Sequence, residues 1–214
     1  MRYLVLAALV AACGNEPAPE SPVTLERRPG RPGERIAVRI EHKRINQVSP
    51  HQAVEMSKKG SYVDEVQPAA GVVRSGSFGD EEIRLELTRR EGRLVDDRGE
   101  RQDVFEQFEA LLPTRPVRPG DRWQARGFWG TWGHTFPAPA PKLRSVRASC
   151  VYMGRKDRFA TIHVELLAET AKGPWALDGD LAYDLAAEML VRVQLHGTGD
   201  DLGQVLTAER ELLR

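Results

Sequence analysis

Apolar and polar residues alternate in one short segment after another, and this pattern limits the chain to a fold built mainly of β-strands. A period of two places every second side chain on the same face, so each segment predicts a strand with one buried face. Short turns separate the segments, for example at Glu91–Gly92 and at residues 154–157, and strands joined in this way form an antiparallel meander or a curved sheet. The segments are residues 36–40, 83–87, 94–95, 143–153, 159–167, 177–185, 189–195 and, more weakly, 202–213.

One helix is predicted between these strands, and a weaker signal indicates a second. Asp103 and Glu106 have the spacing of a capping box, and Pro113 ends the segment. The second signal begins at Ser49–Pro50 and continues to Lys59, before Gly60. The predicted fold class is therefore α+β, mainly β, with one or two helices packed on one side of the sheet. The apolar face of the first helix consists of Val104, Phe105, Phe108, Leu111 and Leu112.

The first thirteen residues resemble the signal sequence of a bacterial lipoprotein. Arg2 precedes an apolar run, which Val10-Ala11-Ala12-Cys13 closes as a lipobox. The run is shorter than the roughly 20 apolar residues of a membrane-spanning helix. The resemblance implies cleavage before Cys13, acylation of that residue by fatty acids such as palmitate, and a protein tethered to a membrane of the cell envelope. Because Gly14 rather than aspartate follows, analogy with lipoprotein sorting indicates the outer membrane.

An ordinary secretory signal or a buried N-terminal strand is the alternative for the same residues. The lipoprotein interpretation divides the chain into a signal peptide (residues 1–12), an acylated cysteine with a linker (13–33) and a single β-rich domain (34–214). The linker contains five prolines and few apolar residues, so little burial can offset the entropy lost on ordering. At about 3.1 Å per residue, it is expected to be a spacer of up to roughly 60 Å.

A second resemblance covers residues 112–123, which read LP-x-x-P-V-x-P-G-D-x-W. The segment is similar to a motif of uncharacterised β-rich secreted and lipid-anchored bacterial proteins, and Gly179–Leu185 looks like a later strand pair of theirs. The resemblance implies that the helix continues through a Pro-Gly turn into a strand beginning at Trp123, whose side chain is expected to be buried in the core. No catalytic residue comes with it.

Charge and cysteine usage exclude several classes of partner. The chain has 31 basic and 31 acidic residues, and removal of Arg2 with the signal peptide leaves a net charge near −1. A nucleic-acid binder needs a basic excess, so no nucleic-acid partner is expected. With Cys13 acylated, Cys150 has no disulfide partner. It alternates with Val146, Ala148 and Tyr152 on one face of a strand, which predicts a buried, inert thiol.

No motif for a metal or a cofactor is present, and none is expected. The five histidines lack compact ligand spacing, and no G-x-S-x-G nucleophile motif occurs. Residues 76–79 are interpreted as a loop. The acidic pairs Asp96–Asp97 and Asp200–Asp201 adjoin glycines and are interpreted as solvated turn residues.

The candidate binding residues are three aromatic side chains in the glycine-rich segment 128–136: Trp129, Trp132 and Phe136. Aromatic rings spaced by glycine can form a platform for a sugar, a peptide or a lipid chain. The alternative is that the two tryptophans cover one open end of the sheet.

Two classes of function remain open at this point. The first is a non-enzymatic, membrane-anchored envelope lipoprotein that acts as an interaction module or carries an apolar ligand, with an envelope protein or that ligand as its partner. The second is a hydrolase-like envelope enzyme whose site is assembled from scattered residues such as His134, Asp121 and Asp184. A deep apolar pocket favours a carrier, a filled core favours an interaction module, and a cluster of histidines and carboxylates favours an enzyme.

Overall fold

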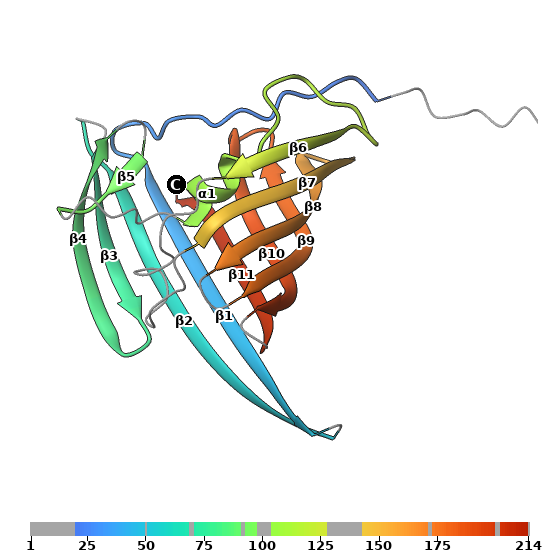
Figure 1. The fold of residues 1–214 in the computed structure, drawn as a ribbon. Coiled ribbons are helices and arrows are strands. Elements are labelled where there is room, and N and C mark those ends of the chain that lie inside the picture. Colours follow the sequence, from blue (N-terminus) through green and yellow to red (C-terminus); the bar gives the residue numbers. More distant parts are fainter. Residues whose placement is uncertain are drawn as a thin grey trace, which may run out of the picture.

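The computed structural model describes residues 20–49, 51–68, 71–90, 93–97, 104–127, 143–170, 173–199 and 202–213. These residues form one antiparallel sheet of eleven strands with a single short helix, α1, at Val104–Glu109 (Figure 1). The prediction of a mainly β fold with an antiparallel sheet is therefore confirmed. The strands are β1 (Arg35–Ser49), β2 (Gln52–Val66), β3 (Val72–Phe78), β4 (Glu81–Arg90), β5 (Arg93–Val95), β6 (Arg122–Gly127), β7 (Leu143–Lys156), β8 (Phe159–Thr170), β9 (Pro174–Asp184), β10 (Met189–Gly199) and β11 (Leu202–Leu213).

The sheet consists of two meanders that share one seam. The strand order is β5-β4-β3-β2-β1-β11-β10-β9-β8-β7-β6, so every neighbour is also a neighbour in sequence except at the contact of β1 with β11. There, Ile40 lies opposite Ala208 and Val38 lies opposite Arg210. The first and the last long strands of the chain therefore meet in the middle of the sheet.

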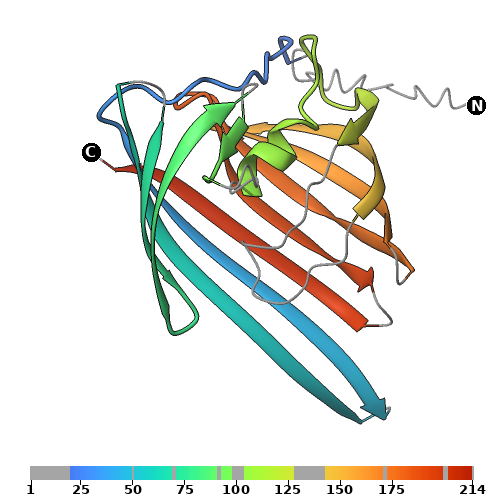
Figure 2. The same cartoon turned by 60° about the vertical axis from the view of Figure 1, so that its left-hand side comes forward.

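The sheet is strongly curved, and its concave face holds the core (Figures 1 and 2). Alternation places one side chain in two on that face: Val38, Ile40, Ile162, Val193 and Leu206 are buried. Helix α1 packs there as well, because Val104, Phe105 and Phe108 are fully buried. The opposite, convex face carries mainly polar and charged side chains, as the period of two predicts.

Two glycines allow β9 and β10 to approach closely where the sheet curves. Gly179 has φ +151° and Gly197 has φ +155°, a backbone conformation that other residues rarely adopt. A Cβ atom at Gly197 would lie 2.0 Å from the carbonyl oxygen of Ala176, and one at Gly179 would lie 2.1 Å from that of Gln194. Only glycine fits at these two positions.

The helix expected between Ser49 and Lys59 was a wrong prediction, because these residues belong to a long hairpin of β1 and β2. Gln52 is already part of β2, and its register runs from Gln52 opposite Ser49 to Glu65 opposite Arg35. Val54 and Met56 are exposed in this strand, so they provide no apolar face that a helix could bury. Ser49 stands at the end of a strand here, where a hydroxyl is as common as at the start of a helix.

A strand was also missed where the sequence indicated a loop. Residues 76–78 belong to β3, and Gly76 lies opposite Tyr62 in β2. A Cβ at Gly76 would lie 2.2 Å from the carbonyl oxygen of Ser61. The glycine that suggested a loop therefore permits close contact between two strands.

The predicted helix at residues 103–112 is confirmed in position but is shorter than expected. Helix α1 ends at Glu109, and the next residues continue in tighter turns, with the Leu111 N–H donating to the Phe108 carbonyl at 2.9 Å. Leu111 remains buried. Among the described residues, no helix is long and apolar enough to cross a membrane.

Residues 20–33, expected to be a spacer, form an ordered segment that we call the strap. It crosses the end of the sheet at which α1 lies (Figure 1). Val23 exchanges two backbone hydrogen bonds with Val117, both 2.9 Å, and Leu25 is 1% exposed in the core. Arg28 makes two hydrogen bonds to the Glu34 carboxylate, at 2.9 and 3.2 Å. These few apolar contacts and ion pairs suffice to order a segment whose composition is typical of a linker.

Strap and sheet are joined by an ionic network around two buried carboxylates of α1. Glu106 accepts hydrogen bonds from Arg27 of the strap, from Arg89 of β4 and from the Leu94 N–H of β5. Glu109 pairs with Arg27 and with Arg210 of β11, and the Arg210 guanidinium lies over the Phe105 ring. The network fixes α1 between both meanders.

Strand β6 begins at Arg122, one residue before the expected start at Trp123, and the Trp123 side chain is only partly buried, not fully buried in the core as predicted. Its indole N–H donates to the Leu111 carbonyl at 2.8 Å, and its ring packs against the edge of the core.

We expect Trp123→Ala to lower the free energy of unfolding by about 2–3 kcal/mol, below the 3–5 kcal/mol typical of a fully buried aromatic side chain. Urea unfolding of the variant measures this loss. A change below about 1 kcal/mol would show that the ring contributes little to the core.

Candidate functional site

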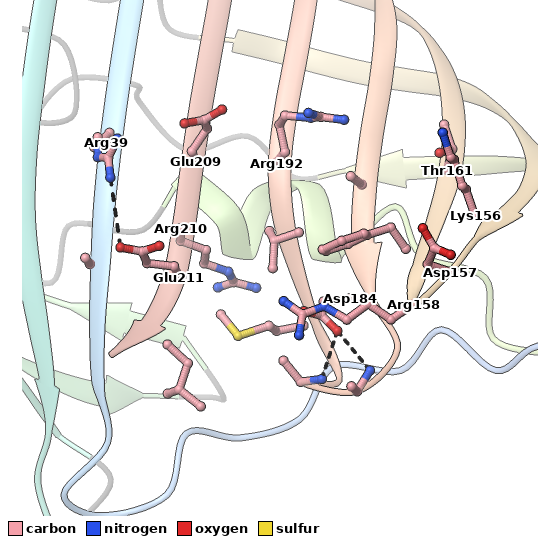
Figure 3. Close-up of a pocket in the computed structure, with 18 residues that line it drawn as sticks. Arg39, Lys156, Asp157, Arg158, Thr161, Asp184, Arg192, Glu209, Arg210 and Glu211 are labelled. Carbon is pink, nitrogen blue, oxygen red and sulfur yellow. Dashed lines mark hydrogen bonds and ion pairs between the residues drawn. The ribbon is translucent and has the colours of Figure 1, made fainter. Parts of the chain in front are cut away.

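A hollow lies on the convex face of the sheet. It has a volume of about 740 Å³, and Figure 3 shows its lining side chains in front of strands β1, β11, β10, β9 and β8, with α1 behind the sheet. Its floor is a row of cross-strand partners: Arg39 lies opposite Glu209, which lies opposite Arg192, which lies opposite Ala182. The hollow therefore lies over the outer face of the central strands.

Charges of opposite sign alternate along this hollow. Arg39 and Glu211 form an ion pair at 3.9 Å, and both side chains are well exposed. Exposed pairs of this kind contribute at most about 1 kcal/mol. Arg192 adjoins Glu209 in the same row. Because positive and negative groups are interleaved, the hollow presents no field of one sign for a charged ligand.

Asp184 is one of the carboxylates considered for an enzymatic site. It stabilises a turn at the edge of the hollow. It is buried, and its Oδ1 accepts hydrogen bonds from the Ala186 and Ala187 N–H groups at 2.9 and 3.2 Å. Its other oxygen pairs with Arg158 at 3.1 Å. Both oxygens are thus committed to holding the β9–β10 turn.

Asp121, the second such carboxylate, holds the Pro-Gly turn before β6. Its Oδ2 accepts from the Arg118 N–H at 3.0 Å and lies 3.5 Å from Arg115. The Gly120 N–H donates to the Tyr152 carbonyl at 2.8 Å, and the Tyr152 N–H donates to the Asp121 carbonyl at 3.0 Å. A turn at Pro119–Gly120 therefore leads into β6, and the carboxylate of Asp121 has a structural role in it.

The described histidines and Cys150 do not gather into a reactive cluster. His163 lies 3.0 Å from Asp180 and His196 lies 3.5 Å from Asp178, in two separate pairs on the sheet surface. His42 is hydrogen-bonded to Gln204 at 2.8 Å, and burial lowers its pKa. Within the described ranges, no group of three or more histidine, cysteine or acidic side chains could hold a metal ion.

Cys150 is buried, as its alternation with Val146, Ala148 and Tyr152 predicted. Burial raises the pKa of its thiol to about 12, so the thiolate is not populated near neutral pH. This agrees with the interpretation of Cys150 as an inert core residue.

The remaining candidate residues lie outside the described part of the chain. They are Cys13, Trp129, Trp132, His134 and Phe136. The proposed acyl anchor and the proposed aromatic platform therefore stay predictions from the sequence.

Among the described residues, three of the seven exposed large apolar side chains lie on the β1–β2 hairpin. Its distal part, residues 46–59, projects beyond the rest of the sheet, at the opposite end from the strap (Figures 1 and 2). We call this part the ribbon. On one side, the pairing of β1 with β11 ends at Ile45 opposite Gly203; on the other, the pairing of β2 with β3 ends at Gly60 opposite Phe78. The ribbon therefore consists of two strands, with an open edge on each side in the described structure.

Three large apolar side chains of the ribbon are exposed: Val48 (58%), Val54 (47%) and Met56 (49%). Val54 lies opposite Asn46 and Met56 lies opposite Arg44. The period of two places Val54 and Met56 on the same face as Tyr62, which is buried in the core. The concave face of the sheet thus continues onto the ribbon, where Arg44, Asn46 and Lys58 share it with these two apolar side chains.

The other face of the hairpin is closed by ion pairs at the base of the ribbon. Lys43 lies 3.0 Å from Glu55, Lys59 lies 3.4 Å from Glu41, and the Ser57 hydroxyl donates to Glu41 at 3.0 Å. Slight burial alone would raise the pKa of Glu41, but these hydrogen bonds and the charges of both lysines outweigh it, so that this pKa lies below its usual value. The ribbon therefore has one face closed by ion pairs and one face on which Val54 and Met56 are exposed beside polar and basic side chains.

Sequence reasoning missed the ribbon because residues 49–59 were interpreted as a helix. A signal for it was nevertheless present: Val54 and Met56 are two residues apart, and Tyr62 and Val66 continue the even positions. Comparison of the chain with models of protein families, with curated proteins and with solved structures found no match.

Proposed function

We propose that this chain is a non-enzymatic, lipid-anchored protein of the bacterial cell envelope that acts as an interaction module through the ribbon. The observation that carries the proposal is the position of the ribbon, which projects from one end of the domain while the strap crosses the other (Figure 1). Exposed apolar side chains are common when scattered singly, but a group at the tip of a projecting element is typical of a contact surface.

The position of the strap limits how far the domain can lie from the proposed anchor. Glu20, the first described residue, accepts a hydrogen bond from the Tyr152 hydroxyl at 2.8 Å and so lies against the sheet. Glu20 stands seven positions after Cys13, and an extended chain over seven positions spans at most about 25 Å. An acylated Cys13 would therefore hold the strap end close to the membrane and leave the ribbon at the far end.

The anchor is tested by Cys13→Ala. We expect this variant to lose all labelling by a radioactive or clickable fatty acid, because two or more acyl chains are attached at this residue in the proposed form. The variant should remain as an uncleaved precursor or appear in the soluble fraction. Unchanged labelling would contradict an anchor at Cys13.

The role of the ribbon is tested by photo-crosslinking in the native cell. A photoreactive amino acid in place of Val54 should give discrete adducts of higher mass, because this side chain would lie inside the contact. The matched control is Leu167 of β8, which is 61% exposed on the body of the sheet. Identical adducts at both positions, or none at Val54, would contradict the proposal.

A second candidate function is the transport of an apolar ligand on the concave face. The observation that favours it is that Val54 and Met56 lie on the same face of the sheet as the buried core. Native mass spectrometry of the protein purified from its host distinguishes the two. A stoichiometric lipid that stays bound would favour a carrier, and unliganded protein would favour an interaction module.

A further inference from the structure

We propose that strand β6 receives an extended segment of a partner protein, in which acidic and apolar residues alternate, as an added strand. β6 is the outermost strand of the meander that does not contain the ribbon (Figure 1), so this is a second contact surface beyond the proposed function. Three features of β6 carry the inference: an open backbone edge, a groove beside that edge and a row of arginines on its outer face.

The backbone of β6 points away from β7 at every second residue. The Tyr152 N–H of β7 donates to the Asp121 carbonyl at 3.0 Å. Because backbone groups alternate along a strand, the N–H and carbonyl groups of Arg122, Gln124 and Arg126 point to the opposite side. No described strand pairs with β6 on that side. An open edge of this kind is a template for a further strand.

A groove lies beside this edge, between β6 and residues 110–117, which follow α1. Its volume is about 240 Å³, below the roughly 300–1,000 Å³ of pockets that enclose a small-molecule ligand. Its lining includes Trp123 and Ala125 of β6 and Leu112, all partly buried. In a strand paired with β6, side chains opposite Trp123 and Ala125 would share their face. The groove therefore suits apolar side chains of a peptide.

The outer face of β6 is basic. Arg122 and Arg126 are exposed on this face, and Arg147 of β7, also exposed, lies directly opposite Arg126. None of the three side chains forms an ion pair with a described residue. Residues 122–127 and their partners 146–151 include no acidic residue. Because like charges directly opposite each other destabilise a sheet, a carboxylate next to this pair would relieve the repulsion.

The acidic residues around this row do not neutralise it. Asp121, just before β6, accepts a hydrogen bond from the Arg118 N–H and lies 3.5 Å from Arg115. Glu165 and Glu169 belong to β8, which pairs with the other side of β7. The open edge of β6 therefore keeps a positive outer face.

The two faces of β6 define the pattern of the partner strand. Residues opposite Arg122 and Arg126 are expected to be acidic. Residues opposite Trp123 and Ala125 are expected to be apolar. A second copy of this chain does not match, because two copies of β6 paired about Gln124 would place arginine opposite arginine. A phosphate headgroup would pair with the arginines but would leave the groove and the open backbone groups without a partner.

The test uses the acylated full-length protein in phosphatidylcholine nanodiscs and a fluorescent synthetic peptide, with binding measured by fluorescence anisotropy. The peptide reads threonine, glutamate, valine, threonine, valine, glutamate, threonine, so both glutamates lie on one face and both valines on the other. It reads the same in both directions and therefore fits either strand orientation. We expect saturable binding. A peptide of the same composition with adjacent glutamates and adjacent valines should bind at least tenfold more weakly.

A pair of variants at Gln124 tests the backbone contact. Gln124→Pro removes an N–H that faces the open edge but no hydrogen bond between β6 and β7, so peptide binding should weaken at least tenfold. The matched control Gln124→Ala also loses the side-chain hydrogen bond to the Ser149 hydroxyl, but it keeps the N–H. Its binding should stay within about twofold of wild type. Circular dichroism should show that both variants keep the sheet.

A peptide with N-methyl groups on alternate amides, prepared in both registers, tests the same contact without altering the protein. The register that methylates the amides facing β6 should not bind, because it lacks the donors for the open carbonyl groups.

The charge of the outer face is tested by Arg122→Gln with Arg126→Gln. This double variant should weaken peptide binding at least tenfold at low salt, and the difference should shrink at high salt. The matched control is Arg84→Gln, at an exposed arginine of β4 in the other meander. It should leave binding unchanged.

Several results would overturn the inference. Undiminished binding to a folded Gln124→Pro variant, or of both methylated peptides, would exclude an added strand. Undiminished binding to the double arginine variant would exclude an acidic partner. Absence of peptide binding would overturn the inference as well, and binding of vesicles that contain phosphatidylglycerol would then assign the arginines to a lipid surface. Crosslinking at Val54 reports on the ribbon alone, so failure here is distinct from failure of the proposed function.

Discussion

Replacing Arg74 with methionine should lower the free energy of unfolding by about 3–5 kcal/mol, because it leaves the carboxylate of Asp64 buried without its counter-charge. Arg74 of β3 lies directly opposite Asp64 of β2, and both are buried. Two parallel hydrogen bonds of 2.8 Å join the guanidinium to the carboxylate. The guanidinium also lies 3.9 Å from the centre of the Tyr62 ring, which supports it from one side.

The matched control is the double variant Arg74→Met with Asp64→Leu. It removes both charges and keeps apolar volume, so much of the lost stability should return. Chemical unfolding of wild type, both single variants and the double variant measures the coupling between the two residues. If the double variant is less stable than Arg74→Met alone, the loss arises from packing and not from an unpaired charge.

Replacing Gly197 with alanine should cost at least about 3 kcal/mol, which combines an unfavourable φ with a steric overlap. The added Cβ would lie 2.0 Å from the Ala176 carbonyl oxygen and 2.9 Å from the Leu177 Cα. Both atoms belong to the backbone of β9, so relief requires the two strands to separate. Thermal unfolding followed by circular dichroism should show a large fall in the melting temperature.

Gly33→Ala is the control for this prediction. Gly33 also has a positive φ, +84°, but no atom lies within 4 Å of the position of an added Cβ. Its cost should therefore be about 1–2 kcal/mol, from backbone conformation alone. Equal losses for the two variants would contradict a steric origin at Gly197.

The strands that the sequence predicted correctly are those in which burial follows the alternation. In β8, Ile162, Val164 and Leu166 are apolar and buried, so the apolar–polar alternation in the sequence matches the alternation of buried and less buried side chains. In β2 and β3 the rule fails, because Asp64 and Arg74 occupy buried positions as a pair and neither looks like a core residue by itself. The ion pair between these two residues allows charged side chains to be buried there. A single sequence does not show which charged residues will form such a pair.

Neither the strap nor the ribbon was predicted from the sequence, and the reasons are related. Arg27 and Arg28 resemble solvated linker residues until Glu106, Glu109 and Glu34 are placed around them. The ribbon is defined by where β11 and β3 end, which depends on strand register. Of the candidate site residues, Asp121 follows the predicted Pro-Gly turn and Asp184 lies in the predicted strand 177–185, but whether their oxygens were free could be seen only in three dimensions.

The seam between β1 and β11 determines the order in which this sheet can be completed. All other ladders join consecutive strands, whose pairing closes short loops and is fast. The seam joins Ile36 to Leu212, so it needs nearly the whole polypeptide. Until the last strand has emerged, each meander exposes one long unpaired strand, and a chain interrupted before Leu202 would keep the edge of β1 open for association with other chains.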